Sequence, residues 1–225
     1  MFRLFWIASL ASNLGTWIHE VGAGWLMTTL DATPEMVAAV RTSMALPIVF
    51  LAIPAGVLAD RIDKRHLLIG TQSILLFVTA MLAVSTATGV ITAWGLLAMT
   101  FIIGLGMVVH VPTWQSAIPE LVPRWQISRA VGLGSISFNL ARAVGPAIGG
   151  VLIALLGIWS TFAINAISFA GVLTVLIRWQ RDTTETSRGR SFFSSMRQGI
   201  RYVALKRTMR HVMLGVVLFV LSGSA

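Results

Sequence analysis

Residues 56–68 read GVLADRIDKRHLL, a short charged run in an otherwise apolar chain. Its charged residues are Asp60, Arg61, Asp63, Lys64 and Arg65. The twenty residues before this group contain one charge, and the eighteen residues after Leu68 contain none. Because about 20 apolar residues suffice to cross a bilayer as a helix, both flanking stretches are predicted to be membrane spans. The charged run is predicted to be the short turn between them.

The composition of the whole chain is typical of a membrane protein. Of its 225 residues, 56% are hydrophobic and 11% are charged, whereas a soluble domain carries about 25% charged residues. Working outward from the charged turn gives six complete candidate spans, near residues 4–30, 36–59, 67–88, 91–118, 130–157 and 160–177. The predicted fold is an all-α membrane protein with a six-helix bundle at residues 1–177 and the start of a seventh span at residues 212–225.

Basic residues gather on one side of these predicted spans. Fifteen of the 17 Lys and Arg residues precede the first span or lie between spans 2 and 3, 4 and 5, or 6 and 7, and the opposite loops contain none. The positive-inside rule therefore places the N-terminus and the basic loops in the cytoplasm. The net charge of +9 is explained by this topology, so nucleic acid is not an expected partner.

Residues 178–211 form the one long connection between predicted spans. The stretch SFFSSMRQGIRYVALKRTMR at residues 191–210 places Phe193, Met196, Ile200 and Val203 at helical spacing, with most of its basic residues elsewhere. We predict a basic cytoplasmic linker with an amphipathic helix, which either lies on the anionic leaflet or packs on the protein. Six spans, a basic linker and the start of another span indicate one half of a longer protein.

The orientation of the protein in the membrane does not explain the acidic residues of the charged turn, because Asp and Glu contribute little to that orientation. Asp60 ends the second span, and Gly56, one turn earlier, would let two helices approach closely. The turn resembles the signature G-x-x-x-D-R-x-G-R-[KR]-[KR] of the major facilitator superfamily. The residues that fit are Gly56, Asp60, Arg61 and Arg65. Lys64 replaces an arginine of the signature, and Asp63 replaces its glycine.

This resemblance implies a role for the charged turn. In the family, the aspartate and the arginines close a cytoplasmic gate between the two halves of the transporter while it faces outward. Lys64 would belong to that gate, although a basic residue at this point could equally be only a topology signal.

A second pattern lies in the predicted span 130–157. The residues that fit it are Gly132, Gly145, Pro146, Gly149 and Gly150. They match G-x8-G-x3-G-P-x2-G-G, the antiporter motif of the same superfamily, with Ala141 in place of the second glycine. Small residues let helices pack closely, and proline removes one backbone hydrogen bond. In relatives this motif marks exporters that exchange substrate for protons, so the resemblance implies efflux.

The stretch from residue 111 to 150, VPTWQSAIPELVPRWQISRAVGLGSISFNLARAVGPAIGG, is similar to one branch of the superfamily. This branch comprises the bacterial transmembrane secretion effectors, among them the enterobactin exporter and macrolide efflux proteins. The resemblance covers the whole chain but only the N-terminal half of a family member. It implies a cavity between two six-span halves, a small-molecule substrate such as a drug or a siderophore, and a second half as partner.

Three full charges lie inside the predicted spans, where a charge costs about 2.5–3.5 kcal/mol on insertion scales. They are Glu20, Arg41 and Arg142. Along the first span, Ser9, Asn13, Thr16 and Glu20 form one polar stripe at helical spacing, which would line a wet cavity or a polar helix seam. Glu20 is the candidate that loads and releases a proton, with Arg41 within reach. A permanent, purely structural Glu20–Arg41 salt bridge is the alternative.

The other polar candidates admit several roles. Arg142 continues a similar stripe with Ser135 and Asn139, and it could bind an anionic substrate group, bind Glu20 or hold helices together. His110 shares a helix face with Met107 and Trp114, either as a cavity wall or as ordinary helix packing.

Enzymatic functions find no support in the sequence. It has no cysteine and no G-x-x-x-x-G-K-[ST] phosphate loop, and neither a Ser/His/Asp constellation nor a cluster of metal ligands stands out. We therefore expect no catalysis, no cofactor and no metal site, and an ion gradient, with protons as the coupling ion, as the energy source. The alternative function is a half-size membrane interaction protein that assembles with a separate partner half.

Overall fold

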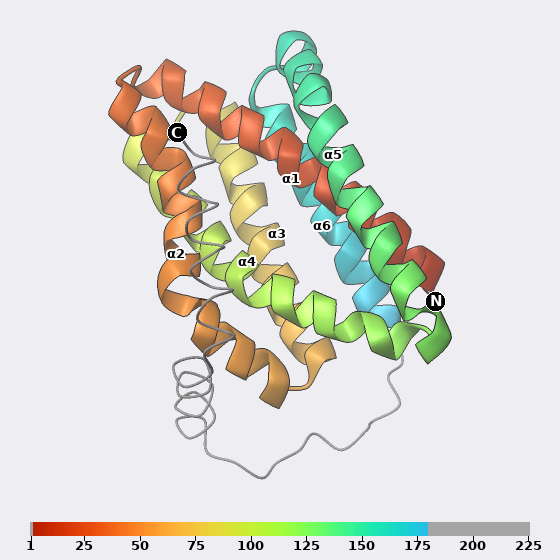
Figure 1. Ribbon diagram of the computed structural model, residues 1–225. Helices are drawn as coiled ribbons and strands as arrows, with labels where there is room; N and C mark the ends of the chain where they lie inside the picture. Colours follow the sequence, from red (N-terminus) through yellow and green to blue (C-terminus); the bar gives the residue numbers. More distant parts are fainter. Residues whose placement is uncertain (1, 180–225) are drawn as a thin grey trace, which may run out of the picture. The chain divides into compact units, whose positions relative to one another are not determined.

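The computed structural model describes residues 2–179, which are helical apart from short connections (Figure 1). The elements in chain order are α1 (Phe2–Leu30), α2 (Pro34–Arg61), α3 (Lys64–Ala87), α4 (Ala93–Leu121), the 3-10 helix η1 (Arg124–Gln126), α5 (Ile127–Leu156) and α6 (Trp159–Arg178). Residues 180–225 lie outside the described residues. They include nearly all of the predicted linker 178–211 and the predicted start of a seventh span at 212–225.

Five of these helical segments are long and apolar enough to cross a membrane, within the part of the chain that the structure describes. They are Pro34–Ala59, Lys64–Ala87, Ala93–Leu121, Arg124–Leu156 and Trp159–Arg178. Helix α1 has 29 residues and carries Asn13, His19 and Glu20, and it is not one of these five segments. Its crossing, which would complete the six predicted spans, stays a prediction.

The helix ends follow from local sequence. Pro34 is at the start of α2, where the φ angle that a proline ring imposes suits a first helical turn. Thr92 caps α4 by accepting a hydrogen bond from the Gly95 backbone N–H at 3.1 Å. Gly89 (φ 72°) and Gly157 (φ 89°) adopt the left-handed region in the two turns that follow α3 and α5. Short, well-defined connections keep consecutive helices antiparallel.

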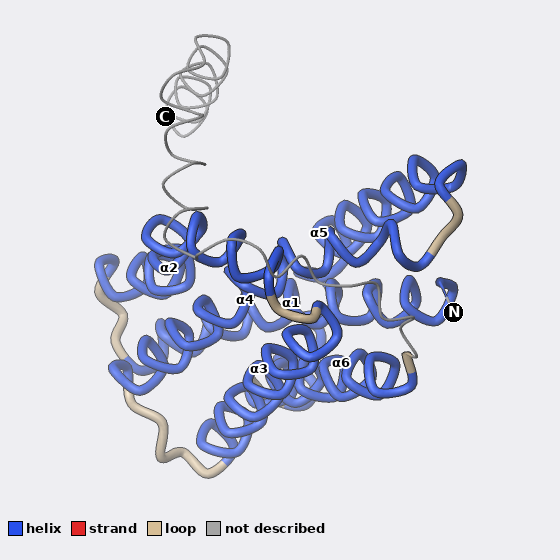
Figure 2. The backbone as a smooth tube through the Cα atoms, turned by 90° about the horizontal axis from the view of Figure 1, so that it is seen from below, coloured by secondary structure: helices blue, strands red, loops and turns tan. Residues whose placement is uncertain are grey.

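The packing of the helices has an internal repeat (Figures 1 and 2). Helix α1 packs along α5 and α6, α4 packs along α2 and α3, and α3 packs along α6. Exchanging α1, α2 and α3 for α4, α5 and α6 reproduces the same set of contacts. The bundle is therefore built from two related triplets of helices, and the alternating helix direction gives them opposite orientations.

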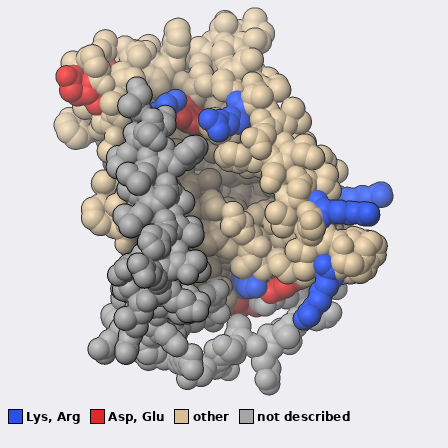
Figure 3. Space-filling view, viewed as in Figure 1, with Lys and Arg blue, Asp and Glu red and all other residues tan. Residues whose placement is uncertain are grey.

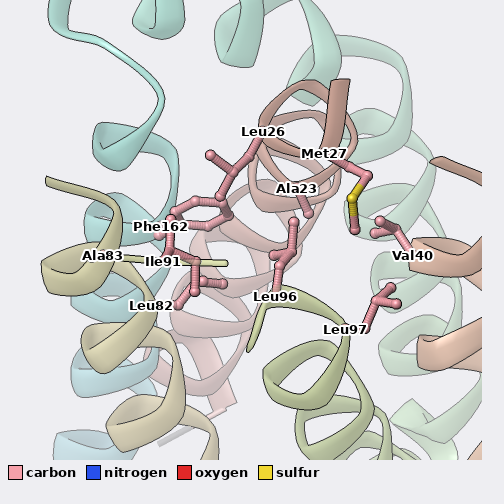
Figure 4. Packing of buried hydrophobic residues seen from close by; sticks show 10 residues of the cluster. All are labelled: Ala23, Leu26, Met27, Val40, Leu82, Ala83, Ile91, Leu96, Leu97 and Phe162. Atoms are coloured by element: carbon pink, nitrogen blue, oxygen red, sulfur yellow. The ribbon is translucent and has the colours of Figure 1, made fainter. Parts of the chain in front are cut away.

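The hydrophobic core lies mainly between α1, α3, α4 and α6. Its largest cluster joins residues from these helices with Val40 of α2 and Ile91 of the α3–α4 turn (Figure 4). Helix α5 buries only small side chains, namely Ala130, Ser137, Ala141, Gly145 and Gly149. Large apolar side chains of α2 and α5, such as Phe50 and Leu155, stay exposed. These two helices thus present apolar surface on the outside of the bundle.

At Gly104, α4 approaches the backbone of α2 closely. A Cβ atom at this position would lie 2.5 Å from the Met44 carbonyl oxygen and 3.1 Å from Pro47 Cγ. Because a helix backbone cannot rotate away as a side chain can, we expect Gly104→Ala to destabilise the protein by about 1–3 kcal/mol. Thermal unfolding of the purified protein in detergent would measure the change.

The matched control is Gly134→Ala on α5, where a Cβ would meet no described atom within 4 Å. That variant should be as stable as the wild type or slightly more stable, since alanine favours helix. Equal melting temperatures for the two variants would contradict the proposed close contact.

Candidate functional site

An ion pair joins Glu20 of α1 to Arg41 of α2. Arg41 Nη2 lies 3.4 Å from Glu20 Oε1, and the two side chains are 83% and 30% exposed, respectively. Helices α1 and α2 otherwise pack on each other much less than α1 packs on α5 or α6. A pair with one largely exposed partner contributes only about 0–1 kcal/mol. The pair is therefore a weak link between two helices that pack little on each other.

Acidic and basic side chains share one face of the bundle. In the space-filling view, red atoms lie between blue atoms near the upper end of a face that is hollowed in its middle (Figure 3). Charged side chains also lie along the right and lower edges of this view, so they are not confined to the hollow.

The polar stripe of α1 divides between two neighbouring helices. Asn13 Nδ2 donates a hydrogen bond to Ser137 Oγ of α5 at 3.1 Å. Thr16 Oγ1 donates to the Ser12 carbonyl at 2.9 Å within α1 itself. Asn13, Thr16 and Glu20 are all half-buried. Asn13 therefore contributes to a seam with α5, whereas Glu20 faces α2.

Arg142 contacts an aromatic ring instead of Glu20. Its guanidinium carbon lies 5.8 Å from the centre of the Trp17 ring, and Trp17 in turn meets Phe138 edge-on, with ring centres 5.8 Å apart. No ion pair links Arg142 to a carboxylate among the described residues. Asn139 Nδ2 donates to the Ser135 carbonyl at 2.8 Å, which satisfies that amide group within α5.

Two glycines of the antiporter motif form the contact between α5 and α1. A Cβ at Gly145 would lie 2.6 Å from Trp17 Cβ, and a Cβ at Gly149 would lie 3.4 Å from both the Ile18 carbonyl oxygen and Val21 Cβ. At Gly132 and Gly150 a Cβ would meet no described atom within 4 Å. Pro146 lies inside α5, which continues on both sides of it.

Two basic residues of the charged turn hold α3 to its neighbours. Lys64 Nζ lies 2.9 Å from Glu120 Oε1 and donates to the Ser116 carbonyl of α4, also at 2.9 Å. Arg65 donates from Nε to the Leu176 carbonyl at 3.1 Å and from Nη2 to the Ile177 carbonyl at 2.7 Å. Both residues thus act within this bundle, whatever they contact elsewhere.

The other predicted gate residues are less constrained. A Cβ at Gly56 would meet no described atom within 4 Å, so no helix of the described part packs closely there. The side chains of Asp60 and Arg61 lie outside the described part of the structure.

Asp63 explains the departure from the family signature in the turn. Its φ angle is −53°, outside the left-handed region, so glycine is not required there. Its Oδ1 accepts hydrogen bonds from the His66 backbone N–H at 3.0 Å and lies 3.0 Å from His66 Nδ1. Asp63 is therefore the N-cap of α3.

His110 belongs to a packed aromatic region. Its Nδ1 lies 3.3 Å from Thr71 Oγ1, and its ring stacks on Trp114, with centres 5.8 Å apart. Trp114 also contacts Phe5, with ring centres 5.3 Å apart. Within the described residues, no three His, Asp or Glu side chains gather as potential metal ligands.

The whole chain, residues 1–225, matches the family model for transmembrane secretion effectors. The chain belongs to the transmembrane secretion effector family of the major facilitator superfamily. This confirms the resemblance inferred from its two motifs, and the apolar helices make it a multi-pass membrane protein.

Three curated relatives of this secretion effector chain are named transporters or efflux proteins. It is 27% identical to the Staphyloferrin A transporter of Staphylococcus aureus over 99% of this chain and 56% of the relative. It is 24% identical to the Multidrug efflux pump Tap of Mycobacterium tuberculosis over 92% of this chain and 52% of the relative. Macrolide efflux protein A of Streptococcus pyogenes is 23% identical, over 78% and 43%. The chain thus spans about half the length of these relatives.

Several residues that the structure brings into the site of this secretion effector chain are not indicated by its two sequence motifs. Trp17, the partner of both Arg142 and Gly145, lies next to the polar stripe of α1 but carries no signal of its own. Glu120, the partner of Lys64, could have been found as an acid at the basic end of a predicted span. His19 is 2% exposed and packs edge-on against Phe162, and neither of its ring nitrogens has a hydrogen-bond partner among the described atoms.

Proposed function

We propose that this chain is the N-terminal half of a secondary active transporter that exports a small molecule in exchange for protons. The observation that supports this most directly is the ion pair between the half-buried Glu20 and the exposed Arg41, in a chain whose relatives are named transporters and efflux pumps. A carboxyl group at this position, between two helices that pack little on each other, can bind either a proton or, once ionised, the guanidinium of Arg41.

Proton binding would act through the same pair. When Glu20 is ionised, it attracts Arg41 and joins α1 to α2. A proton on Glu20 removes that attraction, and because little other packing holds the two helices together, their separation changes at a small energetic cost. Coupled to rocking of two halves about a midplane cavity, this exchange would drive alternating access.

The remaining parts of the proposal concern the whole transporter. Helix α1 would be the first of six complete spans, and residues 212–225 would begin a seventh after the cytoplasmic linker. The N-terminus would lie in the cytoplasm, below a bacterial inner membrane. Asp60 and Arg61 would close the gate against the second half, which could approach at Gly56, while Gly145 and Gly149 would provide the close-packed contact about which α5 and α1 move.

The test uses the protein as its gene encodes it, reconstituted in proteoliposomes with an imposed pH gradient. The probes are a macrolide, a carboxylate siderophore and a lipophilic cationic dye. We expect at least one probe to move against its concentration gradient, with a proton flux in the opposite direction reported by an internal pH dye. A protonophore should abolish both. Probe transport that continues unchanged when the protonophore is added, or no transport of any probe, would overturn proton-coupled export.

A further inference from the structure

Arg142 is a charge within the bilayer that its contacts only partly compensate. Placing an arginine at the centre of a membrane helix costs about 2.5–3.5 kcal/mol on insertion scales. A cation–π contact returns about 0.5–1 kcal/mol when exposed and about 2 kcal/mol when desolvated. The Trp17 ring therefore does not balance the cost, and no carboxylate of the described residues pairs with this guanidinium. Arg41, by contrast, already has Glu20.

The position of Arg142 is fixed by its surroundings on α1 and α5. The Trp17 side chain packs at its Cβ against Gly145 and at its ring against Phe138. Phe138 and Arg142 are one helical turn apart, so the indole lies against both. The hydrogen bond from Asn13 to Ser137 holds the two helices in register one turn away. These contacts hold the Trp17 ring, and thereby fix the aromatic face over which the Arg142 guanidinium lies.

The N–H groups of the Arg142 guanidinium are suited to bind a negatively charged ligand. A guanidinium over an aromatic face keeps its N–H groups in the plane of the fork, where they can donate two parallel hydrogen bonds to a carboxylate. Arg142 is exposed, and the neighbouring Phe138, 48% exposed, offers apolar surface beside it. One guanidinium matches one negative charge, which favours a carboxylate over a doubly charged phosphate.

We propose that Arg142 and Trp17 form a subsite for the carboxylate of an organic acid, with the apolar body of that molecule lying over Phe138. This inference rests on the proposed function, since it names the chemical class of the exported substrate. The competing explanation is that an acidic residue of the second half pairs with Arg142, in which case a free carboxylate would not bind there.

The test measures binding without a gradient, to the purified protein as its gene encodes it. The probes are radiolabelled 1-naphthoate and 1-naphthamide, which share a shape and differ in charge. We expect the wild type to bind the acid at least ten times more tightly than the amide. Arg142→Gln should lose at least tenfold in affinity for the acid and little for the amide, and Arg142→Lys should be intermediate because it keeps the charge and loses the fork.

The control is Arg129→Gln, an exposed basic residue near the start of the same helix, which should bind both probes as the wild type does. If Arg142→Gln does not fold, the affinity for the acid can still be measured in Arg142→Lys and Trp17→Phe. Trp17→Phe should bind the acid more weakly than the wild type, because phenylalanine offers a weaker cation–π face. Wild-type affinity for the acid in Arg142→Gln, or no preference of the wild type for the acid over the amide, would overturn the subsite.

The same protein in proteoliposomes separates this inference from the proposed function. If the pH gradient drives export of the cationic dye equally well in wild type and Arg142→Gln, and naphthoate binding does not depend on Arg142, the carboxylate subsite fails while proton-coupled export stands. If the acid binds through Arg142 but no probe is moved by the gradient, the subsite stands and the export mechanism fails.

Discussion

Replacing Glu20 with glutamine is expected to reduce gradient-driven export to background while the protein still inserts and folds. Glutamine has nearly the same size but cannot exchange a proton, and the partly exposed ion pair that is lost contributes only about 0–1 kcal/mol. Substrate exchange without a gradient should persist, because it requires no net proton movement. Both rates can be measured with the same proteoliposomes. The control is Glu35→Gln, an exposed acid in the first turn of α2, which should transport normally.

The double variant Glu20→Gln/Arg41→Gln decides between a proton carrier and a structural salt bridge. If the pair is only structural, removing both charges leaves no unpaired Arg41, and export should recover relative to Glu20→Gln. If Glu20 carries the proton, the double variant should remain as inactive as the single one. Export at the wild-type rate in Glu20→Gln would refute the proton role outright.

Arg65→Gln is expected to lower the stability of the bundle substantially. Arg65 donates to the Leu176 and Ile177 carbonyls in the last turn of α6, where carbonyls lack the usual partner one turn further along the helix. The Leu176 carbonyl also accepts from the backbone N–H of the C-cap residue Trp179 at 3.2 Å. Its positive charge also lies at the favourable end of the helix dipole. Each hydrogen bond from a charged group contributes about 1.5–3 kcal/mol, so two would give about 3–6 kcal/mol. Because one of the two is exposed, we expect a loss toward the low end, about 2–4 kcal/mol. Thermal unfolding of the purified protein measures this loss.

The comparison variants for Arg65 separate capping of α6 from gating. Arg65→Lys keeps the charge but not the two-pronged geometry, and should fall between wild type and Arg65→Gln. Arg124→Gln, in the exposed connection between α4 and α5, should leave the melting temperature unchanged. If Arg65→Gln impairs export without lowering the melting temperature, Arg65 acts at the gate between the halves and not as a cap of α6.

The sequence predicted the helices well because a membrane span is specified by composition over a long window. The predicted span 67–88 corresponds to α3, Lys64–Ala87, and 160–177 corresponds to α6, Trp159–Arg178. The predicted span 91–118 ended too early, since α4 continues through Pro119 to Leu121. The pairing of Glu20 with Arg41 could also be predicted, because the depth of each residue in the membrane can be counted from the loop that joins the two adjacent spans.

Other contacts could not be predicted, because they depend on how each helix is rotated and which helix it crosses. A GxxxG pair indicates a close contact but not its partner, so Trp17 opposite Gly145 had no signature. The partners of Arg65 are backbone carbonyls, which every residue possesses. Glu120 opposite Lys64 requires α3 and α4 to be neighbours at that end, and only the folded bundle shows that they are.

The N-cap Asp63 also affects the unfolded chain. A glycine at this position, as in the family signature, would sample many more backbone conformations before folding, and an ordinary residue in a compatible conformation gains about 0.4–1 kcal/mol from that difference alone. Asp63 has such a conformation, at φ −53°. Part of the stability of this turn therefore arises from restricted entropy of the unfolded chain, and the start of α3 is specified locally before any neighbouring helix is in place.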